Sequence, residues 1–133
     1  MKHYRPTALS LIALSLTWMC CNRSDAPAES GGKGGNAILK VFPQHHGNPI
    51  DSGKVYIKYN AQDAPTSYDD SVACIIENGK AVAIFTQLKK GSYYLSGSGW
   101  DSTILEKVKG GLPYKVEQET TLEMILPVSE QHQ

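Results

Sequence analysis

The feature that most limits the fold of this chain is a series of short apolar segments, separated by turn residues, from residue 36 to residue 128. In residues 54–59, Val55, Ile57 and Tyr59 alternate with Lys, Tyr and Lys. A period of two is typical of a β-strand with one buried face. No window in this region combines a helical period with a helix cap. We therefore expect an all-β domain.

The number and spacing of these segments indicate how the strands are arranged. About seven segments follow one another, beginning with residues 37–42, and turn signals lie between them. Many short strands in one domain of this size are typical of a β-sandwich. The connections are too short for parallel crossovers, so most pairs are expected to be antiparallel. The prediction is a single antiparallel β-sandwich of about seven strands.

Two turns set the expected register. Asn78-Gly79 separates the apolar segments 72–77 and 80–85, and this dipeptide is the strongest short signal for a two-residue hairpin. A second turn at residues 88–91 leads into a strand in which Tyr93 and Leu95 are expected to point inward.

The beginning of the chain has the pattern of an export signal. Lys2 and Arg5 precede residues 7–19, which are uncharged and rich in Leu and Ala. A basic start followed by a short apolar run is typical of a secretory signal peptide. The run is shorter than the roughly twenty residues that a membrane-spanning helix needs. We therefore assign residues 1–19 to a signal peptide.

Two cysteines follow this run directly. Cys20 and Cys21 are followed by a polar stretch, and residues 22–35 contain no large apolar side chain. This arrangement resembles bacterial lipoprotein signals, including those of Bacteroidetes. The resemblance implies a lipid on Cys20, with Cys21 as the alternative, and hence an outer-membrane lipoprotein that is periplasmic or surface-exposed. An ordinary cleaved signal followed by two incidental cysteines is the other interpretation.

The sequence thus divides into four parts. Residues 1–19 form the signal peptide, 20–35 the lipidated cysteine and a flexible Gly-rich tether, 36–128 the β-sandwich domain, and 129–133 a polar tail. The chain has 13 basic and 13 acidic residues. Removal of residues 1–19 leaves 11 basic and 13 acidic residues, a net charge of −2. This balance gives no general attraction to nucleic acid, and none is expected as a partner.

Several turn and strand motifs occur in an order known from one β-sandwich family. They are Gly47-Asn48-Pro49-Ile50, Val55-Tyr56-Ile57, Asn78-Gly79-Lys80-Ala81 and Gly91-Ser92-Tyr93-Tyr94-Leu95. Together they resemble transthyretin-like, or carboxypeptidase-regulatory-like, domains over residues 37–128. Segments 97–101 and 108–113 are also similar to small Bacteroidetes lipoproteins. These resemblances imply a fold and no particular chemistry.

Signatures of enzymes are missing from the sequence. There is no Gly-x-Ser-x-Gly, no His-Glu-x-x-His, no phosphate loop and no dinucleotide fingerprint. Hydrolases of the resembled family that act on hydroxyisourate use His and Arg and end in Tyr-Arg-Gly-Ser. This chain ends in Val-Ser-Glu-Gln-His-Gln, and Arg23 is its one arginine after residue 19. We expect a non-catalytic binding or structural module without a cofactor; a small periplasmic enzyme is the distant alternative.

Two groups of residues are candidate metal ligands. His45 and His46 are adjacent, and adjacent side chains of an extended chain point in opposite directions, so we expect a solvent-exposed turn there. Asp63, Asp69 and Asp70 share one loop and offer the oxygen ligands that Ca²⁺ prefers. Their spacing is not that of an EF-hand, and a solvated loop is the favoured interpretation.

Aromatic residues and one cysteine complete the candidates. Tyr56, Tyr94 and Trp100 are possible contacts for a sugar or a protein partner if they are exposed on the sandwich. Tyr68 belongs to the same set of aromatic residues. The alternative is that they are ordinary strand residues. Cys74 lies in an apolar run, and we expect it to be a buried core residue.

Overall fold

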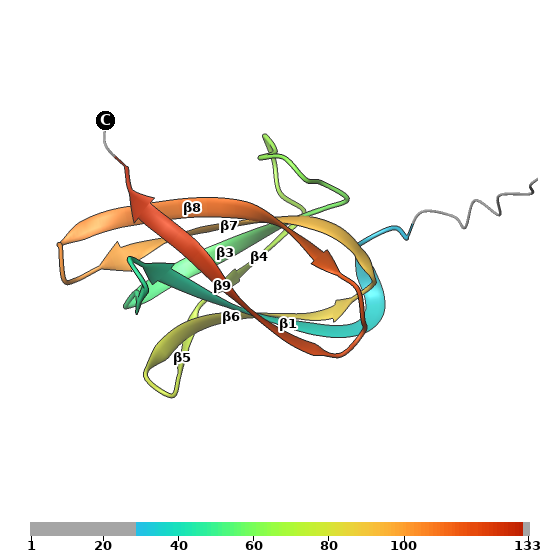
Figure 1. Ribbon diagram of the computed structural model, residues 1–133, viewed down its shortest axis with the longest axis horizontal. Coiled ribbons are helices and arrows are strands. Elements are labelled where there is room, and N and C mark those ends of the chain that lie inside the picture. Colours follow the sequence, from blue (N-terminus) through green and yellow to red (C-terminus); the bar gives the residue numbers. More distant parts are fainter. Residues whose placement is uncertain (1–28, 132–133) are drawn as a thin grey trace, which may run out of the picture.

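The computed structural model describes residues 29–131, and these residues form nine β-strands and no helix (Figure 1). The strands are β1 Lys33–His45, β2 Asn48–Pro49, β3 Ser52–Tyr59, β4 Asp70–Ala73, β5 Ile75–Glu77, β6 Lys80–Leu88, β7 Gly91–Asp101, β8 Glu106–Val116 and β9 Thr121–Glu130. The all-β prediction is therefore confirmed. In the described part of the chain, no helix is long and apolar enough to span a membrane.

The strands form one sheet that is nearly closed into a barrel. Its order is β4-β3-β7-β8-β9-β1-β6-β5, and β2 pairs with β1. The two ends of this order, β4 and β5, are consecutive segments of the chain joined by Cys74. The first segment pairs with β3 and the second with β6, so one stretch of chain changes partners and draws the ends of the sheet together. The sequence predicted about seven strands in two sheets, because apolar segments do not reveal such a change of partner.

One strand pair differs from the antiparallel prediction. β1 and β9 are parallel, from Ile38 opposite Thr121 to His45 opposite Val128. Short connections exclude parallel pairing only between strands that follow each other in the chain. Here all the other strands lie between the two partners, so the connection is long enough for a parallel pair.

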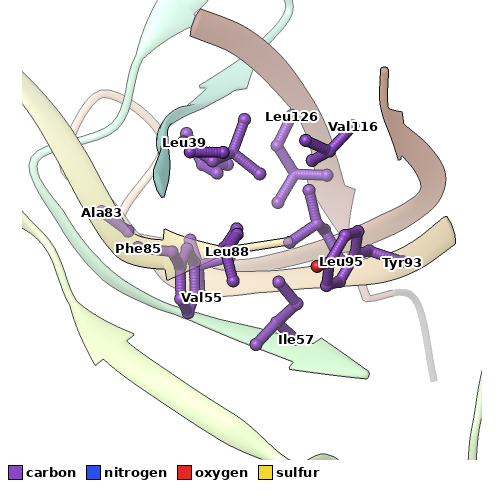
Figure 2. Close-up of a cluster of buried hydrophobic side chains, with 12 residues drawn as sticks. Leu39, Val55, Ile57, Ala83, Phe85, Leu88, Tyr93, Leu95, Val116 and Leu126 are labelled. Carbon is purple, nitrogen blue, oxygen red and sulfur yellow. The ribbon is translucent and has the colours of Figure 1, made fainter. Parts of the chain in front are cut away.

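The core is built from the inward-facing positions of the strands. The period of two predicted for residues 54–59 is confirmed, because Val55 and Ile57 are fully buried and Tyr59 packs against the core. Tyr93 and Leu95 of β7 are also fully buried, as predicted. Figure 2 shows these side chains meeting others from β1, β6, β8 and β9. Burial of one large apolar side chain contributes about 1.5–3 kcal/mol to folding.

The Asn78-Gly79 hairpin is confirmed. Glu77 pairs with Lys80, and the φ angles of Asn78 and Gly79 are 50° and 75°. These positive values at both central residues are those of a type I′ turn. The turn expected at His45 and His46 has the same form: it joins β1 to β2 at His46 and Gly47, with φ angles of 48° and 81°.

The domain begins earlier than the sequence predicted. β1 starts at Lys33, within the stretch assigned to the tether. A Cβ atom at Gly35 would overlap the carbonyl oxygen of Leu88, so this glycine allows two backbones to approach closely. The backbone N–H of Gly32 donates a hydrogen bond of 2.8 Å to the buried hydroxyl of Tyr93. Cys20, Cys21 and the signal peptide lie outside the described residues.

Candidate functional site

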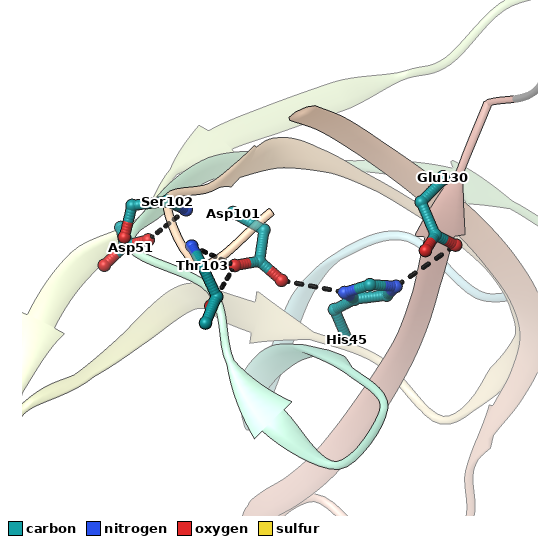
Figure 3. Close-up of polar contacts among 6 residues, drawn as sticks. All are labelled: His45, Asp51, Asp101, Ser102, Thr103 and Glu130. Carbon is teal, nitrogen blue, oxygen red and sulfur yellow. Dashed lines mark hydrogen bonds and ion pairs between the residues drawn. The ribbon is translucent and has the colours of Figure 1, made fainter. Parts of the chain in front are cut away.

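Three inward-facing rows of the barrel end in ionisable residues. His45 is the last residue of β1, Asp101 of β7 and Glu130 of β9. In β1 the buried positions recur every second residue from Ala37 and reach His45. β7 and β9 are both antiparallel to β8, and β9 is parallel to β1, so all three strands end at the same end of the barrel. Figure 3 shows the three side chains pointing toward one another.

His45 lies at the centre of this cluster. Its side chain is 3% exposed, its Nδ1 lies 2.7 Å from Oδ2 of Asp101, and its Nε2 lies 3.2 Å from Oε2 of Glu130. The contact with Glu130 lacks the geometry of a directed hydrogen bond, so the buried Nε2 has a close ionic neighbour but no hydrogen-bond partner among the described residues. The imidazole is thus held by a hydrogen bond at Nδ1, and its buried Nε2 makes no hydrogen bond to the described residues.

Asp101 is fixed by the loop that follows it. Its Oδ1 accepts hydrogen bonds from the backbone N–H of Thr103, at 2.9 Å, and from the Thr103 hydroxyl. These bonds leave Oδ2 for His45. The hydroxyl of Thr103 and then the imidazole of His45 lower the pKa of Asp101. Asp101 is therefore an ionised acceptor, and it directs the proton of a neutral His45 ring to Nδ1.

Two carboxyl groups affect the protonation of His45 at this end of the barrel. The hydrogen bond with Asp101 raises the pKa of His45, burial opposes this effect, and Glu130 adds to the rise. A neutral His45 with its proton on Nδ1 would leave an unprotonated Nε2 at 3.2 Å from a carboxylate oxygen. Two acceptors at that distance repel each other, so the arrangement favours a positive charge at Nε2.

His46 lies on the same side as His45, contrary to the sequence prediction. The two rings are stacked, with centroids 4.1 Å apart and planes 26° from parallel. The prediction of a solvent-exposed turn is wrong for His45, which is buried, and holds for His46, which is exposed. The two side chains do not point in opposite directions because His46 has a positive φ, so the chain is not extended at this residue. Extending the period of two from Ala37 past Pro43 would have identified His45 as inward-facing.

The aromatic candidates occupy the outer face of β3 and β7. Tyr56 pairs with Ser96 of β7, and Tyr94, two residues before Ser96 in that strand, lies on the same face. The ring of Tyr56 packs on that of Tyr68, with centroids 5.4 Å apart. Trp100, which is 40% exposed, lies four residues beyond Ser96, about 13 Å along the strand. The structure thus brings Tyr56 and Tyr68 together and places Trp100 apart from them.

Two of the three acidic residues considered as Ca²⁺ ligands have lysine partners. Asp69 accepts hydrogen bonds from the Tyr59 backbone N–H and the Lys58 ammonium group, at 2.7 and 3.0 Å. Asp70 instead lies 3.4 Å from Lys33.

Within residues 29–131, the one group of three possible metal-ligating side chains consists of His45, His46 and Glu130.

Cys74 is half-buried rather than fully buried as predicted. It packs against both apolar clusters of the core, and burial raises the pKa of its thiol. A raised thiol pKa disfavours the thiolate, which is the reactive form.

No protein family, curated protein or solved structure matches this chain. Its function is therefore argued from the site and from the sequence motifs.

Proposed function

We propose that this protein is a bacterial outer-membrane lipoprotein, periplasmic or surface-exposed, whose β domain is a non-catalytic binding module. The anchor is a lipid on Cys20, with Cys21 as the alternative residue. The basic start, the apolar run and the polar stretch after the cysteines support this assignment. Its two partners are the membrane, through the lipid, and a ligand that the β domain binds.

The observation that carries the proposal is the position of the cluster relative to the chain entry. The described chain enters where β1 begins, at the right of Figure 1, and the arrowheads of β1, β7 and β9 lie at the left. From Lys33 to His45 the chain runs through about 40 Å of extended strand. An anchor before residue 29 would therefore join the domain at the end opposite His45, Asp101 and Glu130.

The contacts of His45 support a binding role more than a catalytic one. A hydrolytic triad needs a nucleophilic hydroxyl or thiol at the imidazole nitrogen opposite the carboxylate. Here that nitrogen faces Glu130, and the nearby Thr103 hydroxyl donates to Asp101 instead.

Lipid labelling tests the anchor. Cells that express the full chain are given a palmitate analogue, and label on the protein is compared among wild type, Cys20→Ser, Cys21→Ser and the double variant. We expect label on wild type, its loss in Cys20→Ser and none in the double variant. Label that persists in the double variant, or that never appears on wild type, would contradict the proposal.

A second candidate ligand is a glycan. Tyr56, Tyr68, Asp69, Asp70 and Ser71 line a shallow groove on the outer face of β3 and β4. Aromatic faces beside carboxylates are groups that stack on and hydrogen-bond to sugars. Affinity electrophoresis in gels with soluble polysaccharides would detect binding. Retardation that is lost in Tyr56→Ala and kept in Trp100→Ala would support this groove, and no retardation with any polysaccharide would reject it.

A further inference from the structure

We propose that His45, His46 and Glu130 bind one divalent transition-metal ion of the zinc type at the end of the barrel where β1, β7 and β9 finish. This proposal deepens the binding role proposed above by naming a ligand, and it does not depend on the lipid anchor. Failure of the lipid-labelling experiment would leave it standing, and failure of the metal experiment would leave the anchor standing.

The distances fit a shared ion. One ligand atom from each of the three residues lies within 4.8 Å of the other two. Ligands of tetrahedral zinc, at about 2.0–2.1 Å from the metal, lie about 3.3 Å from each other. The 3.2 Å between Nε2 of His45 and Oε2 of Glu130 already matches that spacing. His46 is exposed at the turn, so rotation of its side chain can bring the third ligand into place.

The hydrogen bond on the far side of His45 is the one that metal-bound imidazoles usually have. A ligating histidine donates its other ring N–H to a carboxylate or carbonyl, which fixes the tautomer and orients the ring. Asp101 accepts this bond at 2.7 Å and is itself held by Thr103. Nε2 of His45 is therefore buried, oriented and without a hydrogen-bond partner in residues 29–131.

Charge also favours a divalent ion. The carboxyl groups of Asp101 and Glu130 both lie beside His45, at 2.7 and 3.2 Å, so two acidic side chains meet at this end of the barrel. A proton on His45 balances one of these charges, whereas a divalent cation balances both. Because the site is largely buried around His45, this difference is screened less than at an open surface.

The ligand set selects the class of metal. Two imidazoles and one carboxylate suit zinc and neighbouring transition metals, whereas Ca²⁺ and Mg²⁺ prefer oxygen ligands. Three protein ligands leave a fourth tetrahedral position. His46 is exposed and the Glu130 side chain is 23% exposed, so that position faces solvent. A partner group or a water molecule can occupy it.

Calorimetric titration of the purified full chain with Zn²⁺, in detergent micelles, tests the site. His46→Asn removes one ligand, and asparagine tolerates the positive φ of the turn. Glu130→Gln removes the carboxylate charge at nearly the same volume. Glu123→Gln is the matched control, because Glu123 is an exposed acid on the same strand. His132→Ala excludes a contribution from the histidine that follows the described residues, and His3, which precedes them, is present in every variant. The three cysteines are present in every variant.

We expect one equivalent of Zn²⁺ to bind to wild type, Glu123→Gln and His132→Ala with the same Kd. His46→Asn and Glu130→Gln should each weaken binding by about 100-fold or more, since loss of an outer hydrogen-bonding partner alone costs 10–100-fold. Circular dichroism without metal confirms that each variant is folded. No Zn²⁺ uptake by wild type, or wild-type affinity in either ligand variant, would overturn the proposal.

Discussion

Nδ1 of His45 lies 2.7 Å from Oδ2 of Asp101, although the two residues are 56 positions apart and end strands that are not neighbours in the sheet. This contact joins the end of β1 to the end of β7. It also determines which nitrogen of His45 remains available to a ligand.

The carboxylate of Asp101 is expected to act through His45 rather than as a metal ligand. Asp101→Asn keeps an acceptor oxygen but removes the charge that holds the proton on Nδ1. Zn²⁺ affinity should therefore fall by about 10–100-fold while one equivalent still binds. Calorimetry of the full chain measures both quantities. Unchanged affinity would mean that Asp101 does not orient the imidazole, and complete loss of binding would make it a ligand.

The interior of the barrel should respond to loss of volume far more than its outer face. Leu39 is fully buried, and Leu39→Ala should lower the free energy of unfolding by about 2–5 kcal/mol. Ile125 is 57% exposed, and Ile125→Ala should change it by less than about 0.5 kcal/mol. Urea unfolding followed by circular dichroism measures both variants. Similar midpoints would show that β1 does not line the core as described.

The hairpin between β5 and β6 isolates the cost of a backbone angle. A Cβ atom at Gly79 would meet no atom within 4 Å, so Gly79→Val is strained only through its φ of 75°. We expect it to lower the free energy of unfolding by about 1–2 kcal/mol. Lys80→Ala, at the next position, should change it by less than about 0.5 kcal/mol. Equal urea midpoints for the two variants would place the turn elsewhere.

Acid stability should depend in part on Asp69. The backbone N–H of Tyr59 and then the ammonium group of Lys58 lower the pKa of Asp69 in the folded protein. A lowered folded pKa means that the stabilisation is fully present above the unfolded value, about 3.9, and is lost as pH falls through the folded pKa. Asp69→Asn should therefore be less stable than wild type at pH 6, and the difference should shrink below about pH 4.

Urea midpoints of wild type and Asp69→Asn between pH 2 and pH 6 check this prediction. Asp63→Asn, at an exposed position of the same loop, is the matched control. A gap between wild type and Asp69→Asn that stays constant with pH would show that the carboxylate charge has no role.

Local features of this fold could be predicted from the sequence. The period of two identified Val55 and Ile57 as buried, and the chemistry of Asn78-Gly79 located a hairpin. Both depend on neighbouring residues only. The change of partner at Cys74 and the parallel pairing of β1 with β9 depend on how distant segments pack, and no local pattern encodes them.

The candidate site shows the same division. His45 was identified as a possible ligand but interpreted as exposed, since the turn that brings His46 beside it depends on a positive φ at a residue that rarely adopts one. Asp101 and Glu130 carried no motif. Each occupies an inward position at the end of its strand, which becomes visible only when the strand boundaries are known.

X-ray absorption at the zinc edge of the Zn²⁺-loaded full chain tests the metal site most directly. We predict a shell of nitrogen and oxygen ligands at about 2.0–2.1 Å, with outer-shell scattering from two imidazole rings and no sulfur. In His46→Asn, the scattering from one of the two rings should disappear. A sulfur shell at about 2.3 Å, or a spectrum that His46→Asn leaves unchanged, would contradict a site made by His45, His46 and Glu130.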